Sequence, residues 1–209
     1  MNTDPRFTLI AAAHLFYEQG WMAGTAGSMS ARLPDGSFWI TVRGCAKQTL
    51  TPSDFIRMAS DGTVCQRYDL DDYPSSETVV HEAVYATFPK AQACYHIHSI
   101  ESNLVARFTK AEALRLPPLE MLKGLGVSEE HPQVEIPIFP NHGRASGIAA
   151  DISARFETYP PTIPACLIRD HGVVTWAPLV EDAQNYIEIL EYVFRYMVLA
   201  RNINVEIFD

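Results

Sequence analysis

Three histidines have the spacing of metal ligands. His96 and His98 lie two residues apart in an apolar segment that is predicted to be a strand, and alternate side chains of a strand project from the same face. Such a pair alone is more often a solvated or hydrogen-bonded strand face. His171 adds a third imidazole at a predicted turn, where Gly172 permits close backbone approach. Because three histidines with an open position are typical of catalytic zinc, we predict a zinc site here, although iron, cobalt, nickel and manganese also accept these ligands.

A second group of residues forms turns that are rich in small and hydroxyl side chains. It comprises the segment 24–30, the pair Arg43-Gly44, and Ser75-Ser76 at a predicted helix start. Backbone N–H groups in glycine turns, hydroxyl donors and a helix N-terminus can together hold a phosphate group. Each piece is common by itself, since a serine before a helix is often only an N-cap.

The segments around these residues alternate between predicted helix and predicted strand, which indicates one α/β domain over residues 1–209. Caps, apolar spacing and glycine or proline stops predict helices at 5–19, 51–54, 77–87, 99–108, 118–123, 145–157 and 180–201. Predicted strands cover 37–42, 91–98 and 133–139, with a hairpin over 164–176 that bends near 170–172. Short hairpin-like links argue against a purely parallel sheet, so we expect a mixed, largely antiparallel one.

Composition excludes several classes of protein. The chain of 209 residues is 47% hydrophobic and 20% charged, and no apolar run approaches the roughly 18 residues of a membrane span. A net charge of −9 disfavours nucleic acid and anionic membranes as partners. The N-terminal stretch lacks the features of a signal peptide, so a cytoplasmic protein is expected. Four scattered cysteines suggest reduced, mostly buried thiols.

The order of the motifs resembles the class II aldolase/adducin family across nearly the whole chain. The segments that carry the resemblance are Gly-Thr-Ala-Gly-Ser-Met-Ser, Ile-Thr-x-x-Gly, Ser-Ser-Glu, His-x-His-Ser and Arg-Asp-His-Gly-Val. Residues 119–124, 136–141 and 166–176 are more similar to the methylthioribulose-1-phosphate dehydratases of methionine salvage than to sugar-phosphate aldolases. The resemblance implies a lyase of methionine biosynthesis that dehydrates this ketose phosphate to 2,3-diketo-5-methylthiopentyl 1-phosphate.

The resemblance also implies an architecture and a set of site residues. It implies a three-layer α/β/α domain in a homotetramer, with one zinc ion (Zn2+) per subunit held by His96, His98 and His171. The phosphate loops of the family fall on Thr25, Gly27, Ser28, Arg43, Gly44, Ser75 and Ser76. Ser28 stands where many relatives have Asn, and Arg43 replaces a small or hydroxyl residue. A different donor set is therefore expected, with Arg43 making a charge-assisted contact.

Two acidic residues compete for the proton-transfer role. By resemblance, Glu120 acts in the dehydratases and Glu77 acts in the aldolases, where the C3–C4 bond breaks. Either residue can also be a first-turn acid that interacts only with the helix dipole. The alternatives to dehydration are a fuculose- or rhamnulose-phosphate type of aldolase and a non-catalytic, adducin-like interaction module. The intact histidine trio argues against the module, because a binding scaffold needs no convergent ligands.

Overall fold

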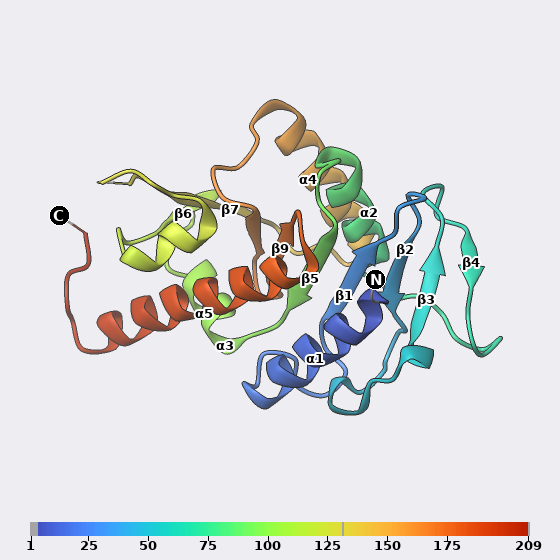
Figure 1. Ribbon diagram of the computed structural model, residues 1–209. Coiled ribbons are helices and arrows are strands. Elements are labelled where there is room, and N and C mark those ends of the chain that lie inside the picture. Colours follow the sequence, from blue (N-terminus) through green and yellow to red (C-terminus); the bar gives the residue numbers. More distant parts are fainter. Residues whose placement is uncertain (1–3, 131, 209) are drawn as a thin grey trace.

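The computed structural model describes residues 4–130 and 132–208, which form one sheet with helices on both faces (Figure 1). The α-helices are α1 (Pro5–Glu18), α2 (Thr78–Thr87), α3 (Ile100–Ala106), α4 (Ala145–Thr158) and α5 (Val180–Asn202). Short 3-10 helices are η1 (Lys47–Thr49), η2 (Pro52–Asp54) and η3 (Glu120–Leu125). The strands are β1 (Ser28–Arg32), β2 (Phe38–Thr41), β3 (Phe55–Met58), β4 (Val64–Gln66), β5 (Ala93–Ile97), β6 (Ala113–Arg115), β7 (Glu135–Phe139), β8 (Ala165–Ile168) and β9 (Gly172–Ala177).

The sheet is mixed and mainly antiparallel. Its strands lie in the order β4-β3-β2-β1-β5-β9-β8-β7-β6. Among the described strands, only β7 and β8 pair in parallel, and every other neighbouring pair is antiparallel. The predicted α/β fold with a largely antiparallel sheet is therefore confirmed.

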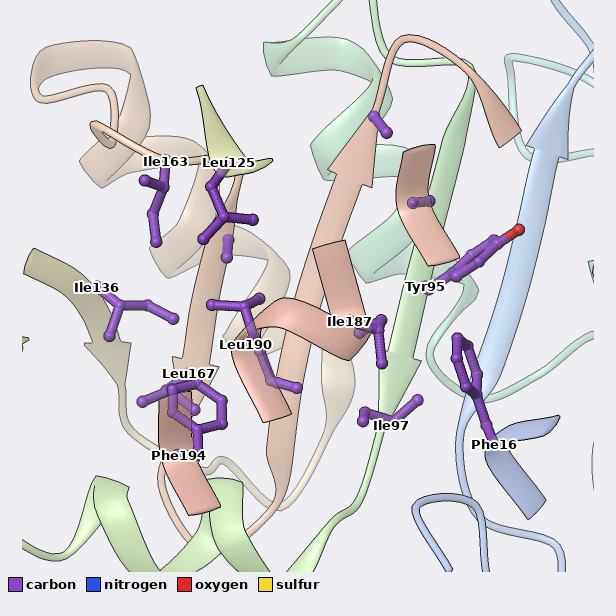
Figure 2. Packing of buried hydrophobic residues seen from close by; sticks show 14 of the residues in the cluster. Phe16, Tyr95, Ile97, Leu125, Ile136, Ile163, Leu167, Ile187, Leu190 and Phe194 are labelled. Atoms are coloured by element: carbon purple, nitrogen blue, oxygen red, sulfur yellow. The ribbon is translucent and has the colours of Figure 1, made fainter. Parts of the chain in front are cut away.

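Two apolar cores cover the two faces of the sheet and make three layers. Helices α1, α3 and α5 pack on one face, while α2 and α4 pack on the other (Figure 1). Figure 2 shows Ile187, Leu190 and Phe194 of α5 pointing toward the strands, with Ile97 and Leu167 among their neighbours. Each fully buried side chain of this kind contributes about 1.5–3 kcal/mol, so α5 is held chiefly by its apolar face.

Local sequence explains where the first helix begins. The Asp4 carboxylate accepts the backbone N–H of Arg6 at 3.0 Å, and Pro5 occupies the first turn, where no N–H is needed. Leu9, Ala12, Ala13 and Phe16 then form the buried stripe of α1. None of the described helices is long and apolar enough to cross a membrane.

Strand β1, which pairs with β5, was not predicted from the sequence. The segment predicted as a glycine-rich turn continues into β1, whose Ser28 and Ser30 are fully buried. Polar residues suit this central strand because His81 on α2 bonds to both hydroxyls, at 2.8 Å and 2.7 Å respectively. Burial of the two serine hydroxyls costs little free energy because each has a hydrogen-bond partner. That partner, His81, is distant in sequence.

Several smaller elements also differ from the predictions. Strands β3, β4 and β6, which have four, three and three residues, were not predicted. The helix predicted at 118–123 was wrong in type, since the structure has the 3-10 helix η3 beginning at Glu120. Likewise the predicted helix at 51–54 is the 3-10 helix η2. The predicted hairpin is confirmed as β8 and β9, which are joined by residues 169–171. All four cysteines are free, and two of them, Cys94 and Cys166, are buried.

A buried carboxyl group in α5 makes stability depend on pH. Glu191 is 2% exposed, its Oε1 accepts the Ser99 hydroxyl at 2.7 Å, and its Oε2 has no partner among the described residues. Burial raises the pKa of Glu191 to about 8 from an ordinary 4.5. Between these values the unfolded chain releases a proton that the folded chain retains, so the free energy of unfolding falls as pH rises.

We therefore expect Glu191→Gln to remove this pH dependence. Glutamine keeps an acceptor for Ser99 and cannot ionise, so the variant should match the parent near pH 4.5 and exceed its stability by on the order of a few kcal/mol above pH 8. Urea unfolding across this range measures the difference. Glu188→Gln changes an exposed carboxylate of the same helix and is the control. Parallel stability curves for Glu191→Gln and the parent would contradict the expectation.

Candidate metal centre

The three predicted ligands lie at one end of the two central strands. In β5, alternate side chains such as Tyr95 and Ile97 enter one core, while Cys94 enters the other. Alternation therefore turns His96 to the α2 side of the sheet. His98 follows the end of β5, where its backbone N–H donates to the Trp21 carbonyl at 2.9 Å. His171 lies in the turn between β8 and β9.

A glycine lets the turn that carries His171 approach β5. A Cβ atom at Gly172 would lie 1.9 Å from the backbone oxygen of Ile97, which no side chain could tolerate. Asp170, before the histidine, has a φ of 57°, and its carboxylate accepts the Arg107 guanidinium at 2.7 Å. Asn103 also donates to the backbone oxygen of His171 at 3.3 Å. Contacts with α3 and its C-terminal end, together with the close approach to β5, therefore fix the turn that carries His171.

The ring nitrogens of the three histidines converge. His96 Nε2 lies 2.8 Å from His98 Nε2 and 3.3 Å from His171 Nε2, and all the ligand atoms lie within 4.8 Å of one another. His96 Nδ1 is 3.0 Å from the Val173 carbonyl, which only accepts, so Nδ1 carries the hydrogen and Nε2 presents a lone pair. Lone pairs that point at one another repel unless a cation lies between them.

The electrostatics also favour neutral imidazoles. Burial, reinforced by the two neighbouring rings, holds the pKa of His96 well below its usual range, and burial lowers the pKa of His98 to about 4. Burial lowers the pKa of His171 as well. Tetrahedral zinc with Zn–N bonds of about 2.0–2.1 Å requires ligand nitrogens about 3.3–3.4 Å apart. The His96–His171 separation of 3.3 Å matches this value, whereas the His96–His98 separation of 2.8 Å is shorter. With a small shift of His98, the trio fits a divalent metal with one position left for another ligand.

One acidic residue adjoins the trio. Glu77 caps the start of α2, and its Oε1 lies 4.0 Å from His171 Nε2. Burial raises the pKa of this carboxyl group, and its Oε2 is buried without a hydrogen-bond partner among the described residues. An acid with a raised pKa beside a metal centre is a candidate for proton transfer.

The structure places the other predicted acid elsewhere. Glu120 begins η3, and its carboxylate accepts Lys123 Nζ at 2.8 Å with 83% of the side chain exposed. It lines a surface depression of about 270 Å³ formed by residues between 118 and 132, to which no histidine of the trio contributes. Within one described chain, Glu77 and not Glu120 adjoins the metal centre.

The predicted phosphate segments lie close to the metal centre and to one another. Gly27 has a φ of 78°, and a Cβ there would be 2.7 Å from the His96 carbonyl. The turn after β2 meets the segment before α2 through two backbone bonds, from Arg43 to Tyr73 at 2.9 Å and from Ser75 to Thr41 at 3.1 Å. The predicted donors that are exposed are Thr25, Arg43, Gly44 and Ser76.

Ser28 differs from the other predicted phosphate donors. Its Oγ lies 2.8 Å from His81 Nε2 inside the fold, and the residue has no exposed surface. Burial lowers the pKa of His81 to about 3, so a neutral ring links Ser28 and Ser30, and Ser30 in turn bonds to Tyr85 at 2.7 Å. The Ser28 hydroxyl therefore braces β1 and is not free to bind a ligand in this arrangement.

Lys47 is a buried residue to which no sequence pattern pointed. This residue starts η1 but is 1% exposed, and its Nζ bonds to the carbonyls of Thr25 and Cys45. A lysine in a short turn is usually solvated. Only the packing of η1 against α1 and the glycine-rich turn reveals that this lysine is buried.

Comparison with known proteins assigns the family. Residues 7–198 match the family described as Class II Aldolase and Adducin N-terminal domain. The chain belongs to this family. It is 53% identical over 198 residues to the methylthioribulose-1-phosphate dehydratase of Microcystis aeruginosa, covering 95% of this chain and 97% of that protein. The enzyme of that name from Leptospira biflexa is 34% identical, covering 91% and 94%.

Solved structures support the same fold. The l-fuculose-1-phosphate aldolase of Thermus thermophilus superimposes with a TM-score of 0.75 at 23% identity, covering 94% of each chain. YgbL of Escherichia coli gives a TM-score of 0.79 at 24% identity, covering 93% of this chain and 88% of that one. Identities this low show the architecture alone.

Removal of one ligand should empty the metal centre without unfolding the protein. We expect His171→Ala to lose most of its bound metal while its thermal unfolding changes little, because His171 is on a turn and partly exposed. Elemental analysis of the purified protein measures the metal. His142→Ala is the control, since His142 pairs with Asp151 at 2.7 Å outside the trio. Full metal content in His171→Ala would remove it from the ligand set.

Proposed function

We propose that this chain is a methylthioribulose-1-phosphate dehydratase of methionine salvage, and that residues 1–209 act as one catalytic domain. The observation that carries the substrate assignment is the 53% identity, over 95% of the chain, to an enzyme of that name. The geometry supports the class of reaction, because a three-histidine centre with a half-buried acid beside it suits removal of a proton next to a carbonyl. A phosphorylated ketose does not cross membranes freely, and the free cysteines agree with a cytoplasmic site of action.

The proposed reaction removes water from C3 and C4 of the substrate. A divalent metal, which we propose to be zinc, would be held by His96, His98 and His171, and when bound it polarises substrate oxygens and makes the C3 hydrogen acidic. A carboxylate of the protein takes that proton, and a carboxyl group returns one to the departing C4 hydroxyl, which leaves as water. The resulting enol tautomerises to the 2,3-diketone, so atoms and charge balance.

The position of the acids favours a second candidate function as well. Glu77 is the acidic residue beside the trio, and the resemblance gives this position to the proton-transfer acid of the aldolases. An aldolase of the fuculose-phosphate type would break the C3–C4 bond and return a proton to the ketose fragment. The two candidates differ in whether Glu120 takes part.

For Glu120 we propose a role in a neighbouring subunit of a homotetramer. Its carboxylate is exposed on a 3-10 turn that lies apart from the trio of its own chain. An exposed acid can reach a metal centre only from outside, across an interface between copies. We therefore propose that Glu120 is the acid/base of dehydration and acts on the metal centre of a neighbouring subunit. Glu77 would support the metal centre of its own chain.

Phosphate recognition is proposed for the turns beside the metal centre. The backbone N–H groups of Thr25, Gly27, Gly44 and Ser76 and the side chains of Thr25, Arg43, Ser75 and Ser76 would hold the dianion, and Ser28 would contribute through the main chain. The backbone bonds that join these turns support this proposal, because they hold the donors of separate segments near one another.

Direct assay of the metal-loaded protein separates the candidate functions. With methylthioribulose 1-phosphate, we expect a product lighter by the mass of one water, as measured by mass spectrometry. Fuculose 1-phosphate should remain unchanged. Cleavage of fuculose 1-phosphate into two fragments, without dehydration of the first substrate, would replace the proposed dehydratase with an aldolase.

Substitution of the acids tests their roles. Glu120→Gln should lower kcat by about 10²–10⁴ with little change in KM, and Glu77→Gln should have a smaller effect. The reverse ranking would favour the aldolase roles. Mixed tetramers of Glu120→Gln and His171→Ala should regain part of the activity, because some sites then combine an intact trio with an intact Glu120 from the next subunit. Mixed tetramers that stay inactive would place Glu120 in its own site or outside the reaction.

A further inference from the structure

Lys47 is a buried cation that takes no part in the reaction proposed above. It is 1% exposed, and its Nζ donates to the Thr25 carbonyl at 3.2 Å and to the Cys45 carbonyl at 3.0 Å. Lysine is almost never fully buried unless an anion pairs with it. These two acceptors are neutral backbone groups.

The charge of Lys47 has no counter-ion within the part of the chain that the structure describes. The ion pairs there involve other residues, and no carboxylate oxygen lies within 4.0 Å of Nζ. Cys45 Sγ is 3.6 Å away, but its thiol donates to the Val42 carbonyl at 2.9 Å, and burial raises the pKa of Cys45. A neutral thiol therefore faces the lysine. Burial of an unpaired ammonium group is costly, and folds retain such a cost mainly at functional sites.

The location of Lys47 indicates which kind of anion it would bind. Thr25 belongs to the glycine-rich turn, and Cys45 follows Arg43-Gly44, so Nζ joins two of the segments proposed to hold phosphate. The metal centre is close, because Gly27, two residues after Thr25, packs against the backbone of His96, whose carbonyl oxygen would lie 2.7 Å from a Cβ atom there. Lys47 thus lies where the phosphate turns meet the histidine trio.

We propose that Lys47 positions the phosphate group of the substrate, by clamping the Thr25 turn to the Cys45 turn and by supplying the positive charge that this dianion requires. The identity of the substrate rests on the proposed function, whereas the binding of a phosphate group by Lys47 does not. The protein has a net charge of −9, which repels anions overall, so a buried positive charge at this point supplies the local electrostatic attraction that an anion needs.

Arg43 is less suited to this role. Its side chain is exposed, and its described hydrogen bond is the backbone contact with Tyr73. Water screens an exposed guanidinium, whereas an ammonium group enclosed by protein interacts more strongly with a nearby phosphate. Arg43 would add to phosphate binding from the rim, while Lys47 acts from beneath the turns.

The test replaces Lys47 with a residue of similar shape. Lys47→Met should weaken binding of inorganic phosphate, measured by calorimetry, by about 10–100-fold, which is typical for loss of a charge-assisted interaction. KM for methylthioribulose 1-phosphate should rise in parallel, with kcat within about threefold and metal content unchanged. The melting temperature should change little, because removal of an unpaired buried charge offsets the loss of the two hydrogen bonds to Thr25 and Cys45. Lys110→Met makes the same change of net charge at an exposed site and is the control.

A second variant separates the charge from the clamp. Lys47→Gln keeps N–H donors for the two carbonyls but has no charge, so it should lose phosphate affinity as Lys47→Met does. Parental phosphate affinity in Lys47→Gln would overturn the role of the charge. Unchanged phosphate affinity and KM in both variants, or no binding of millimolar phosphate by the parent, would overturn the whole proposal. Weaker phosphate binding in a protein that fails to dehydrate the ketose phosphate would uphold Lys47 and reject only the proposed function.

Discussion

The contact between β9 and β5 at Gly172 is the constraint on which the metal centre depends. The backbone of Ile97 occupies the space that a side chain at position 172 would need. This close approach brings His171 to the end of β5, where His96 and His98 lie. The left-handed conformation of Asp170 and its ion pair with Arg107 then fix the direction of the turn. The ligands are thus set by backbone geometry, and metal binding needs little rearrangement.

The phosphate turns are attached to this framework through the main chain. Gly27 packs directly on the His96 carbonyl, and backbone bonds join the turn after β2 to the segment before α2. Loops held in this way can keep their N–H groups directed at a ligand at a small entropic cost on binding. The same contacts fix the position of these turns relative to the histidine trio, and fixed relative positions are what regioselective removal of one proton requires.

Buried polar groups concentrate at this part of the fold. His81 is fully satisfied by two serine hydroxyls, whereas Glu77 and Glu191 each have one oxygen without a partner among the described residues, and Lys47 bonds only to neutral groups there. Such groups reduce stability. The apolar cores on both faces of the sheet offset that cost, since each of their many buried side chains contributes favourably. Figure 2 shows part of the core under α5. The apolar cores on the faces of the sheet therefore supply the stability, and the polar groups at the end of its central strands supply the chemistry.

The sequence alone predicted the long helices, the β8–β9 hairpin and the pairing of His96 with His98, because caps, apolar periodicity and two-residue spacing act over a few residues. It also pointed to His171 as the third histidine, and the structure brings the three rings together. It did not determine β1, whose buried serines depend on His81, some fifty residues away. Nor did it show that Glu77 adjoins His171, that Glu120 lies apart, or that Lys47 is buried. Only the tertiary structure decided these features, because burial and electrostatic environment arise from contacts between segments that the order of residues leaves unspecified.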